Sequence, residues 1–268
     1  MNRTSTKGRA VARSTKIHPA AAVLFAAAAL LTMAVSAAHA LPTADEVLEA
    51  SIEAMGGRKA FEAIENRVTE GTMSIPAMGI TGKMISYSAP PNLQYSIVET
   101  EGMGSMESGT NGEVVWEKTA MTGPRVKTGA ERAAALREAI FNSVLEWKKL
   151  YAKTEVVGEE EVDGTMCYKL IMTPPEGEGG PETHYYDQES HLLTKIVLTL
   201  NTEMGDVPIE SFISDYREVD GLKVAFKTRQ VVMSMQEMHF TLDSVKHNVE
   251  LPKDRFALPE DIQALVGD

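Results

Sequence analysis

The decapeptide APPNLQYSIV, residues 89–98, joins a turn to a strand and carries the pattern on which the fold depends. Leu93, Tyr95 and Ile97 share one side of this strand, and the residues between them are polar. A period of two residues is typical of a β-strand with one buried face, and prolines followed by asparagine favour a turn. The stretch therefore predicts a sheet with one apolar face.

Similar alternating runs continue outward from this strand, over about residues 67–118 and again over 153–247. Asn111-Gly112 separates two of the runs. Asn-Gly between strands is a strong hairpin signal because both central residues must accept a positive φ. Hairpins in series produce antiparallel neighbours, so we expect one long antiparallel sheet of about 11 strands.

Two helices are expected before the first strand. Thr43-x-x-Glu46 is a capping box, which satisfies free N–H groups at the start of a helix. Gly56-Gly57 would end this helix, and a shorter one follows over about residues 58–65.

A further helix interrupts the strands. Thr128-x-x-Glu131 is a second capping box and predicts a helix over about 129–145, after a stretch (118–129) that is typical of a mobile loop. A short helix is expected in FALPEDIQAL, residues 256–265. The pattern as a whole predicts a mainly β, α+β fold. A sheet of this length curls, and we expect the N-terminal helices and the inserted helix to cover its apolar concave face.

The stretch VVMSMQEMHFTLDSV, residues 231–245, holds three methionines within six residues. The β pattern over 222–247 is too long for one strand, and its apolar phase flips between Met235 and Met238. A bulge or a reverse turn at Ser234–Glu237 would explain the flip, and the length favours the turn. The methionines would then lie at a hairpin tip, where they either line the mouth of a ligand cavity or fill an ordinary core.

The first 40 residues have the order of a secretory signal peptide. Basic residues precede a nearly continuous apolar run over 20–35, which ends at Ala38-His39-Ala40, a small-x-small cleavage pattern. An uncleaved membrane anchor is the alternative. The leader carries five bases and no acid, so the remaining chain, 41–268, has a net charge of −17 where the whole chain has −12.

The chain after the leader is expected to form a single domain. Its negative charge argues against nucleic acid and anionic membrane surfaces as partners. Cys167 is the only cysteine in the sequence, so no internal disulfide is expected.

No known catalytic pattern is present in the sequence. It contains no phosphate-binding loop and no His-Glu-x-x-His zinc motif. The one cluster of histidines and carboxylates, between His184 and His191, lies on an expected hairpin whose side chains would point to different faces. We therefore expect no catalytic residue, no metal and no cofactor.

Four stretches resemble the periplasmic carriers that sort lipoproteins to the outer membrane, the LolA-like and LolB-like family. They are APPNLQYSIV (89–98), TNGEVVW (110–116), YYDQESHLLTKI (185–196) and DRFALP (254–259). The resemblance spans most of the chain after the leader. It implies an open antiparallel half-barrel, that is, an incomplete β-barrel. The inserted helix would form a lid over an apolar cavity that holds acyl chains.

The chain departs from the usual carrier by being longer, with a larger strand-rich second half. The family has a functional lid arginine, and Arg125, Arg132 and Arg137 are all candidates for that position here. No cysteine lies near the expected cleavage site, which argues for a soluble carrier over a lipid-anchored receptor.

The resemblance implies a non-catalytic, monomeric periplasmic carrier of lipoprotein acyl chains or another lipid, with sorting partners in the inner and outer membranes. The alternatives are an envelope-stress sensor or scaffold that binds a protein segment, and a hydrolase with an unrecognised site. The residues expected to line the lipid cavity are Met84, Leu93, Tyr95, Ile97, Trp116, Leu136, Ile140, Phe141, Phe226, Met233, Met235, Met238 and Phe240.

Overall fold

The structure, a computed structural model, describes residues 40–102, 104–202 and 205–267. The expected signal peptide, except for Ala40, lies outside the described residues, as does Met103. Leu41–Asp268 forms one compact unit. In the described part of the chain, no helix is both long enough and apolar enough to cross a membrane.

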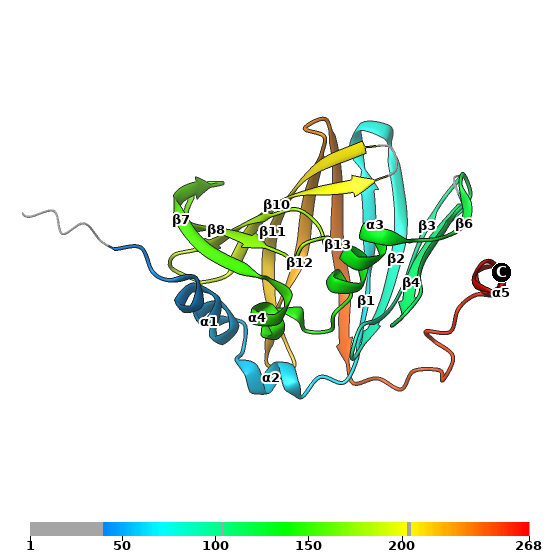
Figure 1. The fold of residues 1–268 in the computed structure, drawn as a ribbon, viewed down its shortest axis with the longest axis horizontal. Helices are drawn as coiled ribbons and strands as arrows, with labels where there is room; N and C mark the ends of the chain where they lie inside the picture. The colour runs from blue at the N-terminus through cyan, green and yellow to red at the C-terminus, as the bar shows by residue number, and fades with distance from the viewer. Residues whose placement is uncertain (1–39, 103, 203–204, 268) are drawn as a thin grey trace, which may run out of the picture. The chain divides into compact units, whose positions relative to one another are not determined.

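Thirteen strands of the described chain form one antiparallel sheet (Figure 1). Strands adjacent in sequence are paired, except β6 and β7, which are the two edges, and β13 pairs with β1. The sheet is therefore open, consistent with the expected half-barrel. The strands are β1 (Arg67–Ile75), β2 (Ile80–Ala89), β3 (Leu93–Thr100), β4 (Gly104–Asn111), β5 (Val115–Thr119), β6 (Gly123–Val126), β7 (Lys153–Val162), β8 (Thr165–Thr173), β9 (Glu182–Asp187), β10 (Leu193–Thr202), β11 (Gly205–Val219), β12 (Leu222–Val232) and β13 (Gln236–His247).

The strand number corrects the expected value of about 11. One addition is β6, which lies inside the stretch that was expected to be a mobile loop. Gly123 and Pro124 interrupt the alternation that is typical of a strand, so the sequence pattern does not predict one here. Proline is nevertheless tolerated in an edge strand, because its missing N–H needs no partner there. β6 pairs with β5 from Thr119↔Gly123 to Trp116↔Val126.

Five α-helices and two short 3-10 helices accompany the sheet in the described residues, and Figure 1 shows α3 and α4 on the same side of it. They are α1 (Ala44–Ala54), α2 (Arg58–Glu62), η1 (Pro76–Met78), α3 (Gly129–Glu138), η2 (Ser143–Glu146), α4 (Trp147–Leu150) and α5 (Glu260–Val266).

One of the two predicted capping boxes is present. The N–H of Glu46 donates to Thr43 Oγ1 (3.3 Å), and the N–H of Thr43 donates to the Glu46 carboxylate (2.7 Å). At the start of α3, Thr128 makes no side-chain capping bond. Glu131 instead accepts hydrogen bonds from Arg125, so a stronger charged partner replaces the predicted reciprocal bond.

The lid helix is shorter than predicted, because α3 ends at Glu138 and Asn142 has a positive φ of 51°. The Asn142 amide holds this bend: Nδ2 donates to the carbonyl of Phe61 (2.9 Å), and Oδ1 accepts from Arg67 (3.3 Å). These contacts with distant segments override the apolar spacing that predicted a helix to residue 145.

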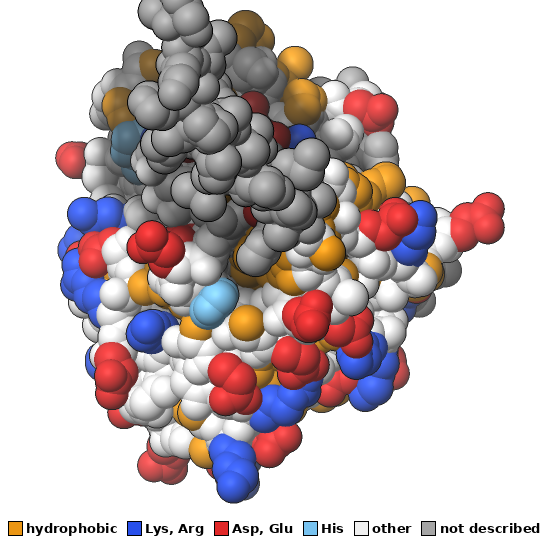
Figure 2. All heavy atoms as spheres, turned by 90° about the vertical axis from the view of Figure 1, so that its left-hand side faces the viewer, with side chains coloured by type: hydrophobic (Ala, Val, Ile, Leu, Met, Phe, Trp, Pro, Cys, Tyr) orange, Lys and Arg blue, Asp and Glu red, His pale blue; other side chains and the backbone are white. Residues whose placement is uncertain are grey.

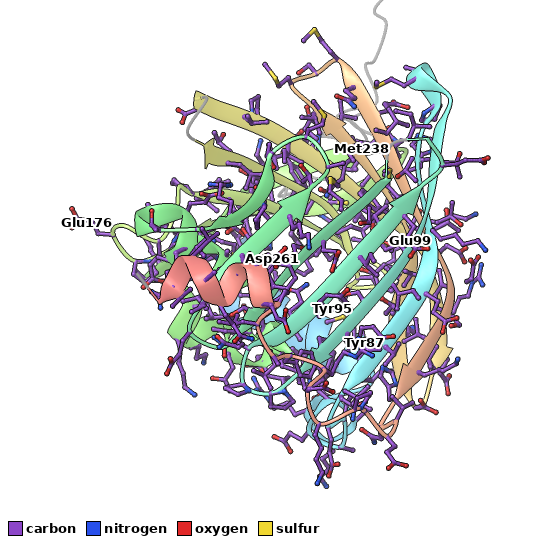
Figure 3. The ribbon with its side chains drawn as sticks, turned by 90° about the vertical axis from the view of Figure 1, so that its right-hand side faces the viewer. Tyr87, Tyr95, Glu99, Glu176, Met238 and Asp261 are labelled. Atoms are coloured by element: carbon purple, nitrogen blue, oxygen red, sulfur yellow. The ribbon has the colours of Figure 1, made fainter. Side chains whose placement is uncertain are left out.

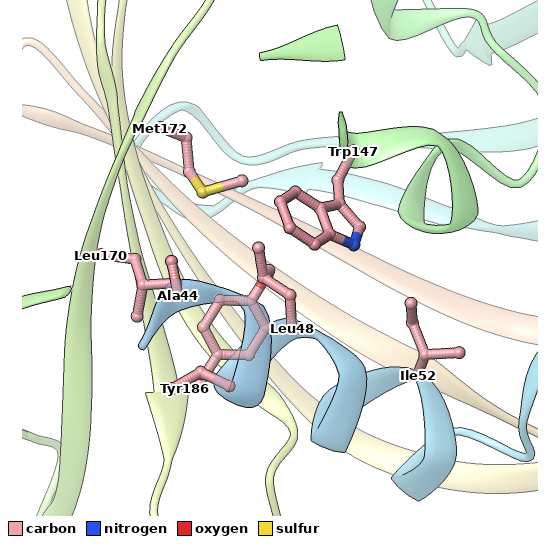
Figure 4. Close-up of a cluster of buried hydrophobic side chains, with 8 residues drawn as sticks. Ala44, Leu48, Ile52, Trp147, Leu170, Met172 and Tyr186 are labelled. Atoms are coloured by element: carbon pink, nitrogen blue, oxygen red, sulfur yellow. The ribbon is translucent and has the colours of Figure 1, made fainter. Parts of the chain in front are cut away.

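The concave core forms where α1 packs against β8 and β9 (Figure 4). Thr43 caps the helix so that Leu48 and Ile52, at helical spacing, both face the sheet, and each is at most 2% exposed. Trp147 of α4 closes the cluster, which also contains Ala44, Val47, Leu170, Met172 and Tyr186.

The C-terminal segment covers the outer face of β2–β6 (Figure 3). The Arg255 guanidinium lies 4.3 Å from the centre of the Tyr87 ring and 5.6 Å from that of Tyr95. Asp261 of α5 forms an ion pair with Lys118 of β5 (2.6 Å). Ile262 of α5 is fully buried as well, so this segment adds apolar packing on the outer face, separate from the concave core.

The predicted turn between β12 and β13 is confirmed, one residue earlier than expected. Met233 and Ser234 have φ values of 53° and 56°, and the N–H of Met235 donates to the carbonyl of Val232 (3.1 Å). Met233 and Met235 are 50% and 80% exposed, so the tip projects into solvent.

The free edge at β7 is strongly acidic, with Glu155, Glu159, Glu160 and Glu161 along one strand. Figure 2 views the molecule from the left-hand side of Figure 1 and shows acidic side chains interspersed with basic ones. Charges on an edge strand oppose pairing with a second chain, which protects the open sheet from aggregation.

The apolar packing on the outer face gives the first prediction. Ile262 of α5 is fully buried, so Ile262→Ala should lower the free energy of unfolding by about 2–5 kcal/mol. Leu265→Ala on the same helix is the control, because Leu265 is 49% exposed and its loss should change stability by less than about 0.5 kcal/mol. Equal effects in urea unfolding would contradict the assigned packing.

Candidate ligand cavity beneath the lid helix

The middle of the concave face contains an apolar hollow of about 280 Å³. Strand pairing brings Met84 of β2, Phe226 of β12 and Phe240 of β13 to this face of the sheet, and all three line the hollow. The remaining wall is formed by Ala225, Thr228, Gln230 and Leu242.

The lid helix α3 borders a second cavity, of about 390 Å³. Ala130, Ala134 and Ala135 face this space, and their small side chains leave it open. Leu198 and Leu200 of β10 form part of the opposite wall. The helix thus bridges the two halves of the open sheet, since β5 and β6 also contribute to the lining.

Charged side chains fix the N-terminal end of the lid. Arg125 of β6 donates to Glu117 of β5 and to Glu131 of α3, each at 2.8 Å, and Lys127 pairs with both carboxylates. The hydrogen bonds from Arg125 lower the pKa of Glu131. Burial alone would raise the pKa of Glu117, but the pairing with Arg125 and Lys127 outweighs it and leaves that pKa lowered.

A buried polar cluster fixes the C-terminal end. Arg137 of α3 is 8% exposed, and its Nη2 donates to Glu182 Oε1 of β9 at 2.6 Å. Glu182 Oε2 also accepts the Tyr151 hydroxyl (2.8 Å) and lies 2.9 Å from His184 Nε2. Three partners therefore converge on one carboxylate.

This convergence keeps Glu182 ionised. Burial would raise its pKa, but the hydrogen bond from His184 and the charge of Arg137 outweigh burial and hold the pKa at about 2. An ionised carboxylate only accepts hydrogen bonds, so the proton on His184 Nε2 points to Glu182.

A third cavity, of about 290 Å³, lies between this cluster and the concave core. Leu48, Trp147, Met172 and Tyr186, all visible in Figure 4, form its apolar wall. The polar part of the wall consists of Arg137, Glu138, Ser143, Tyr151, Glu182 and His184. One cavity thus combines an apolar surface with a localised set of hydrogen-bonding groups, which is the usual composition of a ligand site.

Two further hollows lie at the rim, below the end of α3. A groove of about 570 Å³ runs past Phe61, Pro91, Ile140 and Phe141, and a smaller hollow of about 290 Å³ shares Phe61, Ile140 and Phe141 with it. The N–H of Phe141 donates to the carbonyl of Pro91 (2.9 Å), which joins the end of the lid to the β2–β3 turn.

Five of the residues expected to line a lipid cavity do line one of these spaces: Met84, Ile140, Phe141, Phe226 and Phe240. Leu136 is half-buried on α3 and lines none of the five cavities. Met238 shares the concave side of β13 with Phe240 but does not line the hollow, and Met233 and Met235 project from the hairpin tip.

Leu93, Tyr95, Ile97 and Trp116 lie on the outer face, which corrects the expectation that they face the concave side. The centres of the Tyr95 and Trp116 rings are 6.1 Å apart, and Arg255 of the C-terminal segment lies over the Tyr95 ring. Leu93 and Ile97 share that side because residues at a spacing of two point the same way. The sequence pattern identifies an apolar face but not the direction in which the sheet curls.

The polar cluster was not expected as a unit. Arg137 was one of three candidate lid arginines, and Glu182-x-His184 has the spacing that places two side chains on one face of a strand. That spacing could have indicated that Glu182 and His184 lie together. Arg137 is 45 positions away from Glu182 in the sequence, so no local pattern predicts their contact. Among the described residues, no group of three or more His, Cys, Asp or Glu could hold a metal ion.

Comparisons with known proteins identify the fold alone. No family model matches the sequence, and no curated protein matches it. A DUF1329 family protein from Desulfovibrio piger has a similar structure, with 15% identity, a TM-score of 0.56, and coverage of 79% of this chain and 96% of that one.

Two further solved structures are similar. A LolA superfamily protein from Nitrosomonas europaea has 14% identity and a TM-score of 0.55, over 81% of this chain and 99% of that one. A putative outer-membrane lipoprotein-sorting protein domain from Vibrio parahaemolyticus has 11% identity and a TM-score of 0.52, over 80% and 97%. The chain therefore has a LolA-like fold.

Proposed function

We propose that this protein is a non-catalytic carrier, soluble in the periplasm, that holds an acyl chain of a lipoprotein or another lipid beneath α3. The observation that carries this proposal is a lid helix whose alanines border an open space while ion pairs hold both of its ends. In this space the proposed apolar wall for the ligand consists of the alanines of α3 and Leu198, Leu200 and Val207. The other proposed contacts, Met84, Ile140, Phe141, Phe226 and Phe240, line three further hollows.

The surroundings of the cavity support this function. The hollow at Met84 has an apolar wall from both halves of the sheet, so an extended chain that reached it could contact several strands on the concave side. The shared fold with a lipoprotein-sorting domain supports the same class of ligand. The basic, apolar and small-x-small order of the leader supports export across the inner membrane.

The pair of Arg137 and Glu182 is proposed to set the closed position of the lid. A buried ion pair adds little net stability, because desolvation of the charges offsets their attraction. It nevertheless strongly favours one position, since separating the partners leaves a charge unpaired in an apolar site. Ligand entry would then require α3 to move while Glu182 retains the bonds to Tyr151 and His184.

Filling the space beneath α3 tests the proposed function. Ala134→Trp places an indole in the cavity and should weaken binding of a fluorescent C16 acyl probe at least about tenfold, equivalent to about 1.4 kcal/mol. Arg132→Trp is the matched control, because Arg132 is exposed on the same helix and does not line the cavity. Absence of binding by the unmodified chain, or equal losses in both variants, would refute the proposal.

Breaking the buried pair should release the lid. Glu182→Gln leaves Arg137 without its counter-charge, so the free energy of unfolding should fall by about 3–5 kcal/mol. Hydrogen exchange of residues 129–142 should accelerate more than that of β1 and β13. The combined change Arg137→Met with Glu182→Leu should recover stability, because neither charge remains. Uniform acceleration throughout the chain would contradict a local role for the pair.

The depressed pKa of Glu182 gives a pH dependence with a definite sign. Its pKa is about 2 when folded, against an ordinary value of 4.5, so its stabilising contribution is complete above about pH 4.5 and is lost as the pH falls towards 2. The stability difference between the native chain and Glu182→Gln should therefore be constant from pH 5 to 7 and shrink below pH 4.5. A difference that stayed constant down to pH 2 would contradict the assignment.

A further inference from the structure

The cavity of about 290 Å³ beside the polar cluster contains hydrogen-bonding groups that the fold itself does not use. Arg137 Nε and His184 Nδ1 have no hydrogen-bond partner among the described residues. Both side chains line this cavity, and each is 8% exposed. Buried polar atoms without partners are uncommon, because each one costs about 1–3 kcal/mol of desolvation.

The chemical character of the two atoms follows from their neighbour. Glu182 uses its two oxygens to bind Arg137 Nη2 and His184 Nε2, so His184 donates through Nε2. In the neutral imidazole, Nδ1 is then an acceptor. Arg137 Nε always carries hydrogen and is a donor. Trp147, which lines the same cavity, adds a second donor, because its Nε1 also has no hydrogen-bond partner among the described residues. The cavity therefore offers two donors and one acceptor that remain unused.

The charges around the cavity limit the ligand further. Arg137 is balanced by Glu182, and Glu138, which lines the same cavity, forms no ion pair of its own among the described residues. Burial raises the pKa of Glu138, and the charge of Arg137 offsets only part of that rise. One carboxylate thus remains in excess. An ionised carboxylate or phosphate on a ligand would be repelled here, whereas an uncharged polar group would not.

We propose that this cavity is a head-group subsite for an uncharged group that both donates and accepts hydrogen bonds, an amide or a hydroxyl at the polar end of an acyl ligand. This inference rests on the proposed carrier function and specifies its ligand: acyl chains in amide linkage or with a terminal hydroxyl, in preference to ionised fatty acids. The apolar wall at Leu48, Met172 and Tyr186 receives the first carbons of the chain.

Competition with a bound fluorescent acyl probe tests the subsite at pH 7.5, using dodecanamide, dodecane and dodecanoate. Two variants each remove one unused atom while retaining a donor to Glu182. His184→Gln keeps a donor near Nε2 but has no equivalent of Nδ1, and Arg137→Lys keeps the positive charge but has no Nε. Each should lower the ratio of amide affinity to alkane affinity about two- to tenfold, the value of one hydrogen bond.

Arg132→Ala is the control and should leave this ratio unchanged, because Arg132 does not line the cavity. Glu138→Gln should raise the affinity for dodecanoate, since it removes the excess carboxylate. An unchanged ratio in both variants, or tighter binding of dodecanoate than of dodecanamide by the native chain, would refute the subsite while the carrier function stands. If none of the three compounds displaces the probe because the probe itself does not bind, the carrier function fails as well.

Discussion

The pairing of β1 with β13 is the constraint on which the rest of the structure depends. It joins residues that are 165 to 180 positions apart in the sequence, from Ser74↔His239 to Arg67↔His247, and merges two series of hairpins into one sheet. A sheet of this size has two large faces, and each must be covered. Helices α1–α4 cover the concave side, and the C-terminal segment covers the outer side of β2–β6.

The cavity follows from incomplete coverage. The α1 helix fills the space over β8 and β9 with large side chains, whereas α3 presents alanines to a cavity that Leu198 and Leu200 of β10 also line. Apolar cores normally contain few voids, because empty space forfeits dispersion contacts. A helix that is held by charges at both ends can nevertheless remain above an unfilled space. The ion pairs at Arg125 and Arg137 therefore explain how the lid stays in place without packing tightly.

Local features of the fold could be predicted from the sequence, and features that depend on distant contacts could not. The alternation around Tyr95, the capping box at Thr43 and the β12–β13 turn involve near neighbours, so residue pattern is sufficient for them. The side to which the sheet curls depends on the whole assembly, and Trp116 was accordingly assigned to the wrong face. The end of α3 depends on Asn142, whose partners come from α2 and β1.

Native mass spectrometry provides the most direct measurement of the central claim, that the space beneath the lid holds a lipid. The chain would be produced with its own leader in a bacterial host and purified from the periplasm without detergent. The account predicts a mass of the chain after the leader plus that of a lipid with at least one acyl chain, released on mild activation. A chain that carries no lipid under these conditions, or that carries a bound peptide, would contradict it.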